Sequence, residues 1–155
     1  LALASDAVHD AQTVAPARPI GMQVFDGPGT PEVLGDEARL RQVLSNLMAN
    51  ALQHTPESAP VTVRVGTEGD DAVIEVCDAG PGMNTEDAQR VFERFYREDK
   101  ARSRARGGSG LGLAIVAAVV AQHGGRVDVR QTDGGGATFR VELPTAGTQV
   151  GPSRP

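Results

Sequence analysis

The sequence lacks several features that would assign it to large classes of protein. It has one cysteine, Cys77, which excludes an internal disulfide framework and is compatible with a reducing compartment. It has no run of 18 or more apolar residues and no signal-peptide pattern, so we expect no part of this piece to span a membrane. It also has no Gly-Lys-Ser or Gly-Lys-Thr, which excludes a P-loop as a nucleotide site.

Clustered positive charge is scarce as well. The net charge is -5, and no predicted helix face carries a run of lysines or arginines. Phosphate backbones need clustered cations, so we do not expect nucleic acid as a partner. The basic residues gather only between Arg94 and Arg106, a segment that also carries Glu98 and Asp99. Such a loop fits a small polyphosphate better than a duplex.

The chain is long enough for one domain with a sizeable core, since 39% of its 155 residues are hydrophobic. We interpret residues 1–18 as the frayed end of an upstream helix and a linker, because Pro16 and Pro19 interrupt the helical spacing. The domain itself is expected to span 19–145. The tail at 146–155 is rich in Gly, Pro, Thr and Ser, a composition typical of disorder.

The apolar pattern predicts a helix over residues 37–54, with Asp36 as its N-cap. At about 100° per residue, Asn46, Asn50 and His54 form a second stripe beside the apolar one. A helix with one flank in the core and a neighbouring flank of amides can line a pocket.

The remaining elements suggest an α/β protein with a mixed sheet. Alternating apolar residues predict strands, and the two that flank the turn at Gly69 should be antiparallel. Gly124 and Gly125 should end the last helix. Residues 92–108 show no core periodicity, so we predict a long loop there. Loops of this length inside a compact domain are usually functional or disordered. The strands are predicted at 20–25, 61–65, 72–78, 126–131 and 137–143, and the other helices at 85–91 and 110–123.

Asp78 is the most informative single residue. A strand-end aspartate before glycine is, by itself, more often a turn former. In the context of the other motifs, its carboxylate can accept a hydrogen bond from the exocyclic amine of adenine, where guanine presents a carbonyl oxygen. Gly80 and Gly82 permit positive φ and a close approach of the backbone to the base.

A second glycine motif begins at Gly108. Its spacing imitates a dinucleotide fingerprint, but it follows a long loop rather than a strand, which removes the context that a Rossmann turn requires. The backbone N–H groups at this helix N-terminus, capped by Ser109, can face a phosphate chain. A plain glycine-rich hinge is the alternative. The residues concerned are Gly108, Ser109, Gly110, Leu111, Gly112 and Leu113.

Asn50 is a candidate Mg²⁺ ligand. Magnesium prefers oxygen ligands and keeps water and phosphate oxygens around it, so one neutral amide oxygen suffices when ATP supplies the charge. An isolated asparagine is more often part of a polar helix surface. Asn46, one turn earlier, favours the functional interpretation.

In their order, these motifs resemble the ATP-binding catalytic domain of bacterial sensor histidine kinases. The resemblance covers roughly residues 20–144. It implies the Bergerat fold, a two-layer α/β sandwich whose mixed, mostly antiparallel sheet of about five strands carries three main helices on one face. It also implies ATP and Mg²⁺ as cofactors. The matching boxes are 46–51 (N), 78–82 (G1), 92–97 (F), 108–113 (G2) and 134–138 (final glycine box).

Carried over residue by residue, the resemblance makes Asn50 the Mg²⁺ ligand, Arg97 a phosphate contact and Thr138 a support of the adenine pocket beside Asp78. Gln53 and His54 stand where the family often has Lys and Tyr, which leaves a phosphate contact at Gln53 open. Which other arginines of the predicted loop at 92–108 contact phosphate is also open. The implied ATP-binding set is Asn46, Asn50, Gln53, His54, Asp78, Gly80, Gly82, Met83, Phe95, Arg97, Gly108, Ser109, Gly110, Leu111, Gly112, Leu113 and Thr138.

Asn46 distinguishes subfamilies. Hydrolytic members of the superfamily have glutamate one turn before the Mg²⁺-binding asparagine, where it can activate water, and an amide cannot act as that base. Asn46 and Asn50 are therefore the expected catalytic residues of a protein-histidine kinase. The alternatives are an anti-sigma-factor-like serine kinase and a non-catalytic nucleotide-binding module.

The phosphoacceptor histidine itself is expected on a separate dimerisation domain. His9 precedes Asp10 but lacks the Thr-Pro that follows the phosphoacceptor in the family. The resemblance thus implies three partners: ATP, the phosphoacceptor domain of the same protein, and a cognate response regulator. It also implies a cytoplasmic domain of a parent protein located in the cell membrane.

Overall fold

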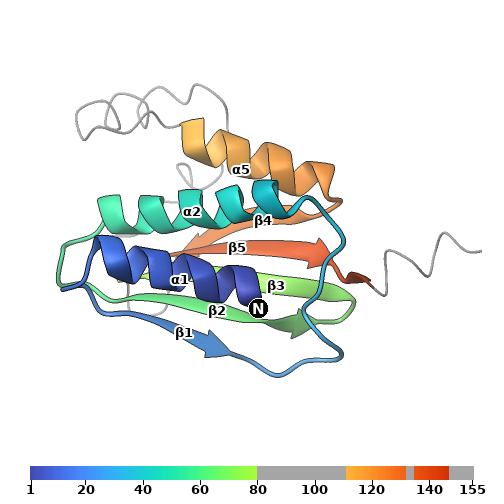
Figure 1. Cartoon of the computed structure of the whole chain (residues 1–155), viewed down its shortest axis with the longest axis horizontal. Coiled ribbons are helices and arrows are strands. Elements are labelled where there is room, and N and C mark those ends of the chain that lie inside the picture. The colour runs from blue at the N-terminus through green and yellow to red at the C-terminus, as the bar shows by residue number, and fades with distance from the viewer. Residues whose placement is uncertain (80–110, 132–134, 147–155) are drawn as a thin grey trace, which may run out of the picture.

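The computed structural model describes residues 1–79, 111–131 and 135–146, and these form a two-layer α/β sandwich with the helices on one face of an open sheet (Figure 1). The strand order is β1-β2-β3-β5-β4. β1 and β2 are parallel, and the other neighbouring pairs are antiparallel. The strands are β1 (Ile20–Val24), β2 (Val61–Glu68), β3 (Asp71–Asp78), β4 (Arg126–Gln131) and β5 (Ala137–Pro144), and the helices are α1 (Ala2–Val14), α2 (Glu37–Gln53) and α5 (Leu111–Gln122).

The predicted fold class and all five predicted strands are confirmed. The helix expected at 85–91 and the loop at 92–108 lie outside the described residues. Of the tail, only Ala146 is described, and its N–H donates to the carbonyl of Glu32 at 2.7 Å. None of the described helices has the length and apolar character needed to cross a membrane.

The N-terminal segment is helical and docked rather than frayed. Residues Ala2–Val14 form α1, which packs on α2 and β1. Asp6 on this helix forms an ion pair with Arg41 of α2 at 2.9 Å, and Gln12 donates to the carbonyl of Ile20 at 2.9 Å. The periodicity was sufficient to predict a helix, but the small alanine side chains gave little sign that it would be docked. Its buried residues are Ala4, Ala7, Val8 and Ala11.

Helix α2 follows the prediction closely. Asp36 caps it, because its carboxylate accepts from the backbone N–H of Arg39 at 3.2 Å and so satisfies one of the open donors of the first turn. The helix ends at Gln53, one residue before the predicted end. The apolar stripe of α2 is buried against the sheet and the other helices. It comprises Leu40, Val43, Leu44, Leu47, Met48 and Ala51.

Alternation along the strands gives the sheet two different faces. The face under the helices is apolar and fully buried at its centre, where Val63, Val76 and Phe139 are neighbours. The opposite face carries charged residues, and Arg64, Glu75 and Arg140 lie side by side across β2, β3 and β5. The side chains of consecutive strand residues therefore lie on different faces, one apolar and covered by helices, the other charged.

The C-terminal end of α5 is bonded to the start of α2. The Nδ1 of His123 donates to the carbonyl of Val119 at 2.8 Å, and its Nε2 accepts from the backbone N–H of Asp36 at 3.0 Å. Arg39 also donates to the side chain of Gln122 at 2.8 Å. The helix stops as predicted, at Gly124 with φ of 74°. These bonds fix the far ends of α2 and α5, so that their other ends meet at a defined separation.

Candidate functional site

Four element ends meet at one end of the molecule: the C-terminal ends of α2 and β3 and the N-terminal ends of α5 and β5 (Figure 1). Asp78 lies there as the last residue of β3, opposite Val61 and on the sheet face that carries the helices. Its exposed fraction is only 6%. Burying a carboxylate at the edge of an apolar layer is costly, so Asp78 requires hydrogen-bond partners.

Asp78 is bonded to the start of β5. Its Oδ1 accepts the backbone N–H of Ala137 at 3.0 Å. Gly136, just before, has φ of 94°, and a Cβ added to it would lie 2.1 Å from the carbonyl oxygen of Asp78. No L side chain fits there. Gly136, in the predicted final glycine box, thus lies directly against the backbone of Asp78.

The predicted position of Thr138 beside Asp78 is corrected by the register. Thr138 pairs with Cys77, so its side chain lies on the sheet face opposite the one to which Asp78 points. There it hydrogen-bonds with the Cys77 thiol. Burial nevertheless raises the pKa of this half-buried thiol above its ordinary value. Ala137, which is buried, occupies the place beside Asp78 that was assigned to Thr138.

Asn46 connects the two helices that flank the site. It is half-buried, and its Nδ2 donates to the carbonyl oxygen of Gly112 in the first turn of α5 at 3.3 Å. This bond requires an N–H donor, which an ionised glutamate does not have. A Cβ on Gly112 would lie at an ordinary 3.7 Å from Asn46. Asn46 of the predicted N box and Gly112 of the predicted G2 box are therefore in contact.

The other predicted residues of α2 lie in its last turn. Asn50 is half-buried, one turn after Asn46, and its carbonyl accepts the N–H of His54 at 3.1 Å. His54, the C-cap, is half-buried, whereas Gln53 is exposed. Leu113, on α5, is 5% exposed and belongs to the hydrophobic core, so its contribution is packing.

Leu111, another predicted site residue, is the first residue of α5. Within the described ranges, no group of three or more His, Cys, Asp or Glu side chains is arranged to hold a metal ion. The predicted residues that lie outside those ranges are Gly80, Gly82, Met83, Phe95, Arg97, Gly108, Ser109 and Gly110.

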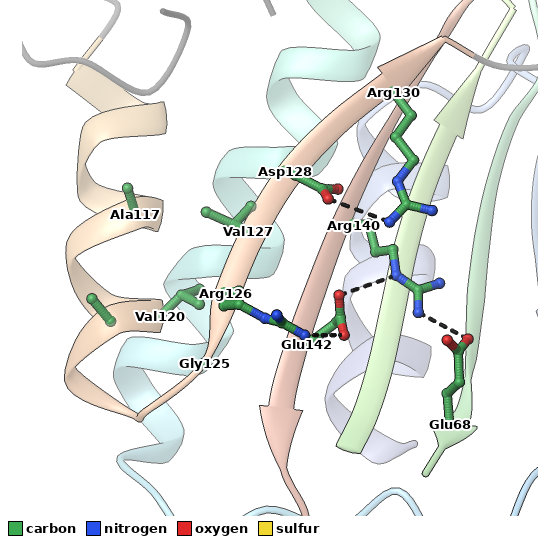
Figure 2. A pocket seen from close by; sticks show the side chains of 11 residues that line it. Glu68, Ala117, Val120, Gly125, Arg126, Val127, Asp128, Arg130, Arg140 and Glu142 are labelled. Carbon is green, nitrogen blue, oxygen red and sulfur yellow. Dashed lines mark hydrogen bonds and ion pairs between the residues drawn. The ribbon is translucent and has the colours of Figure 1, made fainter. Parts of the chain in front are cut away.

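A separate cavity of about 730 Å³ lies beside β4, and Figure 2 shows that it is crossed by ion pairs. Arg140 contacts Glu68 at 2.8 Å and Glu142 at 3.5 Å, and Arg126 contacts Glu142 at 3.0 Å. Burial opposes the charge of Arg140, but hydrogen bonds with Glu68 and Glu75 raise its pKa above the ordinary value. None of the predicted site residues that the structure describes lines this cavity. Its charged residues pair with one another on the outer face of the sheet.

The chain is similar to known proteins in sequence and in fold. Residues 35–147 match the family model described as histidine kinase-, DNA gyrase B-, and HSP90-like ATPase. The chain is 48% identical over 119 residues to the sensor-like histidine kinase SenX3 of Mycobacterium tuberculosis, covering 77% of this chain and 29% of that protein. It therefore spans about a third or less of the length of such relatives.

Solved structures share the fold. A mycobacterial sensor histidine kinase, MprB, has a TM-score of 0.78 at 30% identity, covering 92% of this chain and 93% of that one. Full-length ShkA in complex with AMPPNP has a TM-score of 0.74 at 33% identity, covering 94% of this chain and 30% of that one.

Proposed function

The chain belongs to the histidine kinase-, DNA gyrase B- and HSP90-like ATPase family, and from this premise we propose that it is the Mg-ATP-binding catalytic domain of a sensor histidine kinase. Its reaction is transfer of the γ-phosphoryl group of ATP to a histidine on a separate phosphoacceptor domain. The observation that carries the proposal is the convergence of Asp78, the amide flank of α2 and the N-terminus of α5 at one end of the sandwich.

Asp78 is the adenine-recognition residue in this proposal. Its Oδ1 is oriented by the N–H of Ala137, which fixes the carboxylate at the end of β3. A fixed acceptor suits the exocyclic amine of adenine and opposes the carbonyl oxygen of guanine, a mismatch that costs about 1–3 kcal/mol in a dry pocket. ATP should therefore bind about 5- to 150-fold more tightly than GTP.

The phosphates lie at the N-terminus of α5, where backbone N–H groups and the helix dipole favour anions. The half-buried amide of Asn50 presents the oxygen donor that Mg²⁺ prefers, and the residues present thus fit the cation. When bound, Mg²⁺ neutralises charge that develops on the phosphates. Asn46 holds the first turn of α5 against α2 and supplies no base for water.

The lack of a base at Asn46 favours a kinase over an ATPase. Its substrate would be the phosphoacceptor domain of the same protein, and a response regulator would receive the phosphoryl group in turn. We place the domain on the cytoplasmic side of a membrane-located parent, as for a two-component sensor. A serine kinase of the same fold and a non-catalytic nucleotide sensor remain the rival functions, and phosphotransfer assays with histidine and serine acceptors distinguish all three.

Calorimetry provides the direct test of nucleotide binding. ATP and ADP should bind in the presence of Mg²⁺, and GTP should bind at least about fivefold more weakly than ATP. Removal of Mg²⁺ should lower the affinity for ATP. Equal affinity for ATP and GTP would contradict the role of Asp78, and no binding of any nucleotide would contradict the proposed function itself.

The exposed side of α5 is the surface where we place the phosphoacceptor domain. This helix carries no charged residue, and Ile115 remains 37% exposed next to the exposed Ala118. A helix that is apolar all round normally buries its outer side against another element. The position beside the first turn of α5 would bring an incoming histidine close to the phosphates.

Ile115→Glu should therefore slow phosphotransfer to an added phosphoacceptor fragment by about tenfold or more, the value expected for losing one buried aliphatic contact. Affinity for Mg-ATP should stay within about twofold. Val24→Glu, at a 59% exposed position on the edge strand β1, is the matched control and should leave the rate unchanged. Equal rates for wild type and Ile115→Glu would place the docking surface elsewhere.

A further inference from the structure

Arg18 is buried between the end of α1 and the end of α2, with an exposed fraction of 8%. Its Nε donates to the carbonyl of Ala59 at 2.7 Å, and its Nη1 donates to the carbonyl of Leu52 at 3.3 Å. Its Nη2 donates to the hydroxyl of Thr55. One guanidinium thus bonds the last turn of α2, the residue after its cap, and the loop that leads into β2.

These partners are all neutral. In the ranges that the structure describes, no carboxylate forms an ion pair with Arg18. Removing an unpaired cation from water is costly, and neutral acceptors compensate only part of that cost. A methionine could fill the same space at a lower desolvation cost. The buried arginine is therefore better explained by the geometry that it imposes than by stability alone.

That geometry concerns the open carbonyls at the C-terminus of α2. The carbonyl of Asn50 accepts from the N–H of His54, that of Ala51 accepts from the hydroxyl of Thr55 at 2.7 Å, and that of Leu52 accepts from Arg18. Thr55 in turn accepts from Arg18. A cation at this position also interacts favourably with the helix dipole. The carbonyls of Ala51 and Leu52 are held by one connected network of Arg18 and Thr55.

We propose that Arg18 is a positioning residue of the nucleotide site, which fixes the last turn of α2 so that Asn50 and His54 meet Mg-ATP in the binding orientation. The inference rests on the proposed function. Asn50 lies in the same turn as the carbonyls that the network holds, so a change in the end of the helix moves its amide. Arg18 itself touches neither Asn50 nor His54 in the bonds that define the network.

The backbone of Arg18 is anchored as well. Its N–H donates to the carbonyl of Ala15 at 3.0 Å, directly after α1, and the carbonyl of Pro19 accepts the N–H of Val61 at 3.0 Å. The side chain therefore acts from a fixed base that joins the docked helix α1 to strand β2. Through Arg18, the position of α1 is coupled to the end of α2 that carries the site.

Arg18→Met tests the inference, because it keeps a long unbranched side chain and removes every side-chain donor. Circular dichroism first shows that the Arg18→Met variant is folded. The dissociation constant of the variant for Mg-ATP should then rise about tenfold. The gain in ATP affinity on adding Mg²⁺ should also shrink, because Asn50 is displaced. Arg18→Lys keeps the charge but carries its three donors on a single nitrogen, which cannot reach acceptors arranged around three nitrogens of a planar guanidinium, so a smaller loss of about threefold is expected. The side-chain amide resonances of Asn50 should shift in both variants.

Arg41→Met is the matched control, because Arg41 also connects α1 to α2 but pairs with Asp6 at an exposed position in the first half of α2. It should leave both the affinity and the Mg²⁺ gain unchanged. If Arg18→Met does not fold, Thr55→Val, which removes only the shared hydroxyl, should show the same losses to a smaller degree.

Folded Arg18→Met, or folded Thr55→Val in its place, with wild-type affinity and a wild-type Mg²⁺ gain would overturn the inference and leave the proposed function intact. Absence of nucleotide binding by the wild type would instead overturn the proposed function on which the inference rests.

Discussion

Asn50→Ala should reduce phosphotransfer from ATP to an added phosphoacceptor fragment by at least about a hundredfold, because it removes the amide oxygen proposed to hold Mg²⁺ and the metal carries much of the charge stabilisation in phosphoryl transfer. The measurement is transfer of labelled phosphate to a fragment that carries the phosphoacceptor histidine. The wild-type chain alone should hydrolyse ATP near background, since Asn46 is an amide bonded to the carbonyl of Gly112 and cannot activate water.

Ser45→Ala is the control on the same helix. Ser45 is exposed and is not among the predicted site residues, so its phosphotransfer rate should stay within about threefold of the wild type. Brisk hydrolysis of ATP by this chain alone, lost in Asn50→Ala, would reject the histidine-kinase assignment and favour an ATPase of the same fold.

Asp78→Asn should weaken ATP binding at least tenfold while the domain stays folded. The Ala137 N–H already bonds to one carboxylate oxygen of Asp78. When the single amide oxygen of asparagine accepts from Ala137, its NH₂ group takes the place of the second carboxylate oxygen and faces the adenine amine donor to donor. The loss of one such bond to a charged acceptor corresponds to roughly 1.5–3 kcal/mol. Calorimetry with ATP and thermal unfolding of the same samples provide the two measurements.

Asp78→Ala serves as the comparison, because it also leaves the N–H of Ala137 without its acceptor. It should lower both ATP affinity and the stability of the domain, the latter by about 1–3 kcal/mol. If folded Asp78→Asn binds ATP as the wild type does, Asp78 is not the adenine acceptor, and its role is limited to joining β3 to β5.

The sequence alone was sufficient to predict the strands and helices of the described residues and to select candidate site residues. Its apolar periodicity predicted α2 and its cap at Asp36, and its alternation predicted all five strands, although β2 extends to Glu68 beyond the predicted end. Asp78 and the two asparagines were identified because local patterns place side chains on helix and strand faces without any knowledge of distant contacts. The ordered glycine motifs indicated the family.

Three features were decided only by the tertiary structure. The face on which Thr138 lies depends on the pairing of β5 with β3, some 60 residues earlier in the chain. The docking of α1 depends on a sheet and a helix that follow it, and the bonds of Arg18 to Leu52 and Ala59 join segments separated by 34 and 41 residues. Local periodicity shows which side of an element is apolar, whereas the partner that covers it, and the register in which two elements meet, follow from packing of the whole chain.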